Sequence, residues 1–179
     1  MSKQIFKISL FVGITFVSLL LPPKAIFSLE ETNVKAYFIY QFTKFIEWPS
    51  SVQVDPLVIA VWGHSEITKP LQIIASEKSE PGQKLVVNTV EKVEKLSAVH
   101  ILFIPKEHSD MLPTILNALE NKHIVVITEK NGMAKKGSAI NFVLVGNKIG
   151  FEINLESFKK NNLYISSRLL RLAVEVYGE

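Results

Sequence analysis

Four short apolar runs, separated by segments of helical character, constrain the fold more than any other feature of this sequence. The runs are Leu57–Trp62, Leu85–Val90, Val99–Ile104 and Ile124–Thr128. They are continuously apolar rather than alternating, which is typical of strands buried on both faces. Between them, Ile67–Ala75 and Glu107–Leu119 have helical patterns, and Glu91–Leu96 fits a short helix or a loop. This alternation predicts one α/β domain with a mainly parallel central sheet flanked by helices.

An aromatic helix is expected ahead of the first strand, over Glu30–Trp48. Val34, Phe38 and Phe42 recur at helical spacing, and Pro49 disfavours a helical conformation at the residue before it. A stripe of this kind more often packs a core than lines a ligand site.

The last third of the chain predicts an antiparallel hairpin followed by helices. Two apolar stretches, Ala139–Val145 and Lys148–Asn154, are joined by Gly146-Asn147, a tight two-residue turn. This turn sets the register, so three cross-strand pairs follow: Val145 with Lys148, Phe142 with Phe151 and Asn141 with Glu152. Helices are expected near Leu155–Lys160 and over Ser166–Tyr177.

One polar constellation stands out in this region. Asn141 and Glu152 are expected on one face of the hairpin, and Arg168 and Arg171 share one side of the last predicted helix. The favoured interpretation is structural: Ser166 caps the helix and an arginine pairs with Glu152 to brace it against the sheet. The alternative is that the arginines bind an anion or a partner.

The first 28 residues read as a cleavable export signal. Lys3 and Lys7 precede an apolar run, Ile8–Leu21, and the small residues Ala25 and Ser28 follow a proline pair. The run has 14 residues, fewer than the roughly 20 that a membrane-spanning helix needs. A cleaved leader and a mature domain over 29–179 are therefore expected, with an uncleaved anchor as the alternative.

Charge and cysteine content exclude several functions. The chain has 20 basic and 17 acidic residues, and three of the lysines but none of the acids lie within residues 1–28, which leaves 17 of each sign. No basic excess remains for binding nucleic acid. The absence of cysteine excludes disulfides, thiol chemistry and lipid attachment through a cysteine.

Catalytic and ligand-binding motifs are missing from the sequence. The turn after the first strand, Trp62-Gly63-His64-Ser65, is no dinucleotide fingerprint, and no phosphate-binding loop, zinc motif or nucleophile elbow occurs. We expect no catalytic residues, metal or cofactor. Of the four histidines, only His64 lies just past the carboxyl end of a predicted strand, where open α/β sheets bind ligands.

Three blocks of this sequence resemble YfiR-like proteins. They are Val34–Pro49 (VKAYFIYQFTKFIEWP), the hairpin segments Ile140–Val143 and Lys148–Asn154, and Ile165–Ala173 (ISSRLLRLA). The resemblance extends over about residues 31–177, and between Ala60 and Glu129 only the pattern of elements matches. The blocks do not identify catalytic residues.

The resemblance implies a periplasmic α/β regulator without established catalysis. Characterised members of the family repress an inner-membrane diguanylate cyclase (YfiN), are sequestered by an outer-membrane lipoprotein (YfiB), and form homodimers. Unlike those members, this chain has no cysteine. Two alternatives stay open: a periplasmic small-ligand sensor domain that feeds a two-component system, and an unrecognised periplasmic hydrolase. The candidate partner or ligand contacts are Trp48, His64, Asn141, Glu152, Arg168 and Arg171.

Overall fold

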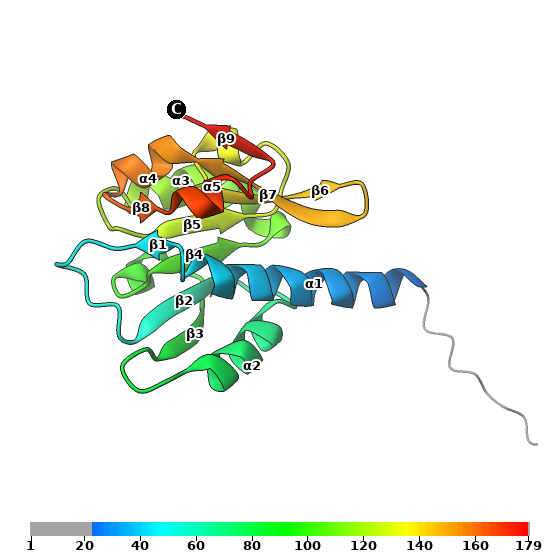
Figure 1. Cartoon of the computed structure of the whole chain (residues 1–179), viewed down its shortest axis with the longest axis horizontal. Coiled ribbons are helices and arrows are strands. Elements are labelled where there is room, and N and C mark those ends of the chain that lie inside the picture. The colour runs from blue at the N-terminus through cyan, green and yellow to red at the C-terminus, as the bar shows by residue number, and fades with distance from the viewer. Residues whose placement is uncertain (1–22, 179) are drawn as a thin grey trace, which may run out of the picture.

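A seven-stranded sheet forms the centre of the computed structural model, which describes the backbone of residues 23–178 and the side chains of residues 29–178 (Figure 1). Its strands, in the order in which they lie side by side, are β3 (Leu85–Val90), β2 (Leu57–Trp62), β4 (Ile101–Ile104), β5 (Val125–Thr128), β6 (Ile140–Val145), β7 (Lys148–Asn154) and β9 (Glu175–Tyr177). All neighbours are parallel except β6 and β7. The predicted fold class is confirmed.

Helices cover both faces of the sheet, which explains the continuous apolar runs. One face packs against α1 (Pro23–Phe42) and α2 (Thr68–Lys78). The other packs against η1 (Val93–Leu96) and α3 (Leu112–Ala118), with η2 (Lys106–Met111) leading into α3. Every residue of β2, β4 and β5 is buried, as expected for strands with both faces covered.

The hairpin has the predicted register. Asn141 lies opposite Glu152, Phe142 opposite Phe151 and Val145 opposite Lys148. The aromatic helix packs on this hairpin: the rings of Phe42 and Phe151 meet edge to face at 5.0 Å between centroids. The aromatic stripe is therefore core packing, as expected.

The first helix differs from the prediction at both ends. It ends at Phe42 rather than Trp48, because the chain turns and forms β1 (Ile46–Glu47), which pairs antiparallel with β8 (Tyr164–Ile165). It begins at Pro23, inside the predicted leader. Residues 1–22 lie outside the described residues, so the export signal stays a prediction.

The predicted helix over Ser166–Tyr177 is wrong in most of its length. Helix α4 (Leu155–Lys160) forms as expected, but α5 spans only Ser167–Leu170, and the chain then extends into β9. Ser166 does cap α5, since its Oγ accepts from the Arg168 backbone N–H at 3.2 Å. Beyond it, the extended conformation brings Val176 opposite the core residue Ile153 in β7. This pairing outweighs the helical periodicity, and β-branched valines favour it.

Candidate functional site

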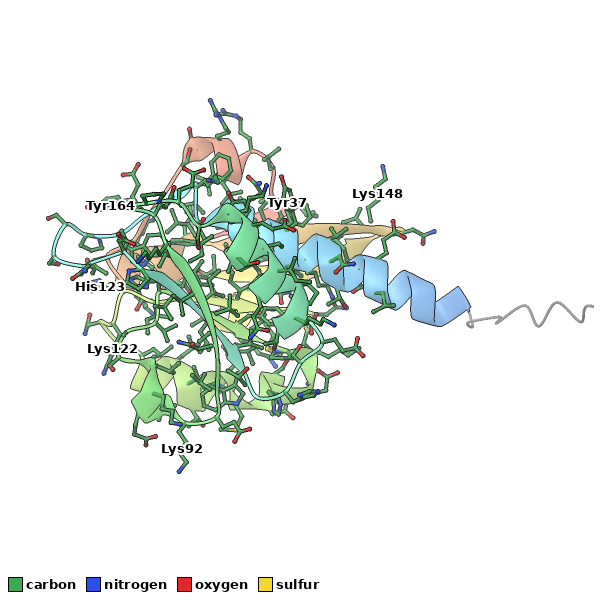
Figure 2. The ribbon with its side chains drawn as sticks, turned by 90° about the horizontal axis from the view of Figure 1, so that it is seen from below. Tyr37, Lys92, Lys122, His123, Lys148 and Tyr164 are labelled. Atoms are coloured by element: carbon green, nitrogen blue, oxygen red, sulfur yellow. The ribbon has the colours of Figure 1, made fainter. Side chains whose placement is uncertain are left out.

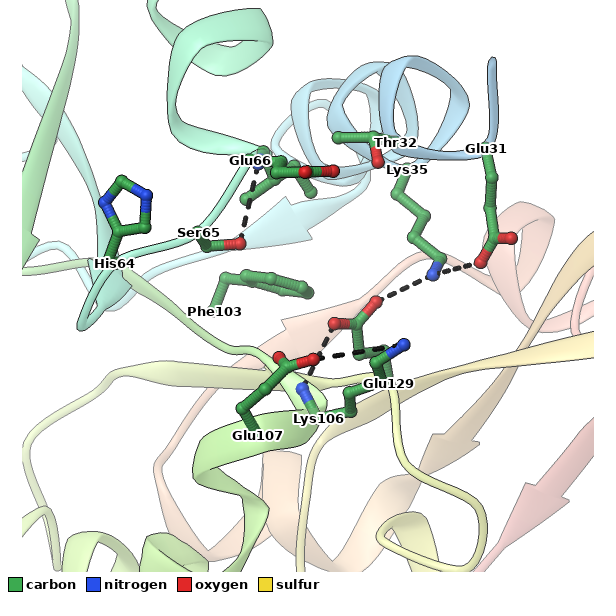
Figure 3. A pocket seen from close by; sticks show the side chains of 11 residues that line it. Glu31, Thr32, Lys35, His64, Ser65, Glu66, Phe103, Lys106, Glu107 and Glu129 are labelled. Atoms are coloured by element: carbon green, nitrogen blue, oxygen red, sulfur yellow. Dashed lines mark hydrogen bonds and ion pairs between the residues drawn. The ribbon is translucent and has the colours of Figure 1, made fainter. Parts of the chain in front are cut away.

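A cavity of about 450 Å³ opens at the carboxyl ends of the parallel strands, beside α1 (Figure 3). The chain leaves β2 toward β3 on one side and returns to β4 on the other. The cavity therefore lies at a topological switch point, the usual ligand position in open α/β sheets. The residues that line it are Glu31, Thr32, Lys35, His64, Ser65, Glu66, Ile67, Phe103, Lys106, Glu107 and Glu129.

The loop after β2 is held in place by a close approach to η2. Gly63 has a φ of +67°, and a Cβ there would lie 2.5 Å from His108 Nε2. Both the left-handed backbone and the contact with the His108 ring require glycine. This turn carries His64 and Ser65 to the cavity wall (Figure 3).

A cluster of three charged residues joins α1 to the end of β5. Lys35 Nζ donates to Glu129 Oε2 at 2.7 Å and to the Glu31 carboxylate one helical turn earlier. The Lys35 and Glu129 side chains are each only 13% exposed. The other oxygen of Glu129, Oε1, accepts from the backbone N–H of Lys106 at 3.1 Å. One carboxylate thus ties together α1, the β5 end and η2.

This cluster keeps Lys35 charged. Burial acts to lower the pKa of Lys35, but the hydrogen bonds and charge attraction of Glu129 and Glu31 outweigh it and raise that pKa. Lys106 and Glu107, which also line the cavity, are held less tightly than this cluster. Lys106 and Glu107 approach only to 3.9 Å, both largely exposed. Among the described residues, no group of three or more acidic or histidine side chains is placed to hold a metal ion.

The sequence candidates are divided among separate regions. His64 lines the cavity at the carboxyl ends of the strands. Trp48 lies at their amino ends, where its Nε1 donates to the carbonyl of His123, just before β5, at 3.0 Å. Its ring also meets His100 edge-on at 5.9 Å. Figure 2 shows His123 at the end of the molecule away from the hairpin residue Lys148. Trp48 and His64 therefore do not form one site.

Asn141 and Glu152 are neighbours, as predicted, but no arginine completes the group. Asn141 Nδ2 donates to Glu152 Oε2 at 3.0 Å, and the Tyr177 hydroxyl donates to Glu152 Oε1 at 3.0 Å. Tyr177 takes the place expected for an arginine because β9 is a strand. Arg168 and Arg171 are exposed and form no ion pair with the residues that the structure describes. Their role as contacts stays a prediction.

Sequence reasoning missed the most buried charged residues of the cavity. Glu31 and Lys35 have the i, i+4 spacing of a helical ion pair. Glu129 directly follows Thr128, the last residue of β5, so the rule that singled out His64 also applied to it.

A family model described as YfiR/HmsC-like matches residues 32–174. This chain belongs to the YfiR/HmsC-like family. The resemblance found in the three sequence blocks is thereby confirmed, and all the cavity residues except Glu31 fall within the match. Membership in the YfiR/HmsC-like family suggests a periplasmic regulatory protein.

Two solved structures share the fold of this YfiR/HmsC-like chain at low sequence identity. One is described as the ABC domain in complex with L-Trp from Streptococcus pneumonia, with 11% identity, a TM-score of 0.51 and 82% of this chain covered. The other is a conserved domain protein from Vibrio cholerae, with 10% identity, a TM-score of 0.52 and 81% covered. The chain spans 60% of each of these two structures. At such identities the likeness shows the fold alone.

No curated protein matches the YfiR/HmsC-like chain. Within residues 23–178, no helix has both the length and the apolar character that a transmembrane span requires.

Proposed function

We propose that this chain is a periplasmic regulator that restrains an inner-membrane signalling protein, such as a YfiN-like diguanylate cyclase, through direct protein contact. The observation that carries the proposal is the family match over residues 32–174. A YfiB-like outer-membrane lipoprotein is the proposed antagonist, and a homodimer is the proposed assembly. The function requires binding surfaces rather than a catalytic centre, in keeping with the absence of catalytic motifs from the sequence.

Deleting the gene is expected to raise cellular cyclic di-GMP, because the cyclase would lose its repressor. Cyclic di-GMP is measured by mass spectrometry in the wild type, the deletion strain and the deletion strain carrying the gene on a plasmid. The complemented strain should return to the wild-type level. Unchanged cyclic di-GMP in the deletion strain, under every envelope stress tried, would argue strongly against the cyclase as partner.

A second candidate function, reception of a small ligand, is supported by the cavity at the switch point. Its lining is polar and charged around a buried floor of Phe103 and Ile67. A ligand that binds only the folded state raises the melting temperature, by mass action. We expect a thermal-shift screen of anions, amino acids and nucleotides to find one that stabilises the wild type more than a His64→Ala variant. No shift with any compound would rule out this candidate for those classes.

A further inference from the structure

The strand β3 forms one edge of the central sheet and lacks the usual protection of an edge. Among residues 23–178 it pairs with β2 alone, at the lower end of the sheet in Figure 1. Its six residues, Leu85–Val90, include no charged residue, proline or glycine. Native edge strands are usually protected by charges, prolines, bulges or covering segments. An edge of this composition is suited to the addition of another strand.

The backbone groups of β3 point alternately toward β2 and away from it. The carbonyls of Lys84 and Val90 each accept a backbone N–H at 2.8 Å from the β2 side. In a parallel ladder the N–H and the C=O of one residue point to the same side, and the side alternates along the strand. The backbone groups of Leu85, Val87 and Thr89 therefore point outward, away from the sheet.

Only the middle of this outer edge is open to a further strand. The N–H of Leu85 donates to Ser79 Oγ at 2.9 Å, so the end of α2 occupies the edge at that residue. In the described part of the chain, the outward N–H and C=O groups of Val87 and Thr89 form no hydrogen bond. These two residues flank Asn88, and the open groups are therefore symmetric about it.

We propose that β3 pairs antiparallel with β3 of a second copy of this chain, about a twofold axis at Asn88. Val87 of each copy then lies opposite Thr89 of the other, and each such pair exchanges two hydrogen bonds, which satisfies every open group. An axis at Val87 would instead require the N–H of Leu85, which Ser79 already binds. The pairing rests on the homodimer of the proposed function and names the surface that forms it.

The side chains agree with an axis at Asn88. Val86, Asn88 and Val90 share the sheet face away from α2, since Val90 packs in the core on that side. Val86 is 36% exposed and would be covered by Val90 of the second copy. The two Asn88 amides meet at the axis, and each offers both a donor and an acceptor. The nearest charged residues, Lys84 and Glu91, flank the paired segment. The edge is thus complementary to itself.

Disulfide trapping tests the pairing directly. Because the chain contains no cysteine, Asn88→Cys introduces one thiol per copy, and the two thiols meet at the axis. Opposite residues that exchange no hydrogen bonds have Cα atoms about 4.5 Å apart, a separation that a disulfide can bridge. Mild oxidation of the protein recovered from the periplasmic fraction should convert Asn88→Cys into a covalent dimer. Ile73→Cys, at a 47% exposed residue of α2, is the matched control and should stay monomeric on a denaturing gel.

Sedimentation equilibrium measures the same contact without a crosslink. The wild type should sediment as a dimer. Thr89→Pro removes an outward N–H that β2 does not use, so the folded protein should tolerate it. The loss of this donor in both copies should raise the dissociation constant of the dimer about tenfold or more. Thr89→Val keeps the N–H and should dimerise like the wild type.

Three results would overturn the proposal. The first is a wild-type protein that sediments as a monomer, and the second is a Thr89→Pro variant that dimerises as tightly as the wild type. The third is a dimeric wild type whose Asn88→Cys variant forms no covalent dimer, because the copies then meet through another surface. None of these measurements involves the cyclase, so their failure is distinct from unchanged cyclic di-GMP in the deletion strain.

Discussion

Replacing Lys35 with methionine is expected to lower the free energy of unfolding by about 2–4 kcal/mol, because it leaves two carboxylates facing each other without a cation. Glu129 would keep only the backbone N–H of Lys106 as a donor, and Glu31 would lose its partner. Methionine preserves most of the aliphatic stem, so the loss reports the charge. Urea denaturation of both proteins at neutral pH measures the difference.

Two further variants distinguish this cluster from an ordinary surface pair. Lys130→Met removes the exposed pair with Asp110 and should change stability by no more than about 0.5 kcal/mol. Adding Glu129→Gln to Lys35→Met should restore part of the loss, since the uncompensated charge is then removed. If Lys35→Met proves as mild as the Lys130 control, the cluster does not fasten α1 to the sheet.

Acidification is expected to destabilise the fold through His100. The backbone N–H of Val58 donates to His100 Nδ1 at 3.0 Å, and the Nε2–H donates to the Gln53 carbonyl at 2.8 Å. A protonated ring has no acceptor for the Val58 N–H. Burial lowers the pKa of His100, and the hydrogen bond to Gln53 only partly opposes this. The unfolded state therefore takes up a proton near pH 6.5, while the folded state resists it.

The sign of the effect follows from proton linkage. The contribution of His100 is fully present above pH 6.5 and is lost as the pH falls below this value toward the lower pKa of the folded state. The melting temperature of the wild type should therefore fall as the pH is lowered through this range. His100→Gln should lower the free energy of unfolding by about 1–3 kcal/mol at neutral pH, because glutamine reproduces the hydrogen bonds of the ring imperfectly. The same variant should show a weaker dependence of the melting temperature on pH.

His64→Gln serves as the matched control for this measurement, because it alters an exposed histidine at the opposite end of the strands. It should leave the dependence of the melting temperature on pH unchanged. Other titratable or charged groups near His100 are Asp55, Lys122 and His123, and these remain in the His100→Gln variant. If the melting temperature of that variant depends on pH as strongly as that of the wild type, these three groups and not His100 cause the dependence.

Local patterns predicted the parts of the fold that local interactions determine. The buried strands follow from apolar runs, and the hairpin register follows from the Gly146-Asn147 turn, which needs no information from distant residues. The C-terminal segment failed for the opposite reason. Its helical periodicity is real, but β7 offers a free edge, and pairing of Glu175–Tyr177 with that edge determines the structure. No local sequence pattern indicates which strand edge of the sheet is left unpaired.

The candidate site shows the same division. His64 was found because its position depends only on where a strand ends. The ion pair between Lys35 and Glu129 joins residues 94 positions apart in the sequence, and only the packing of α1 on the sheet brings them together. The predicted partner of Glu152 was wrong because Tyr177 reaches that carboxylate only when its segment is a strand.

The place where α1 begins has a consequence for maturation. The helix starts at Pro23, and among the residues whose side chains the structure describes, Glu31, Lys35, Phe38 and Phe42 make contacts that seat it on the domain. Proteolytic removal of a leader ending near Ser28 would shorten this helix at its amino end and leave those four residues in place. Precursor and processed chain would then share one folded core, so cleavage could follow folding or precede it without remodelling the domain.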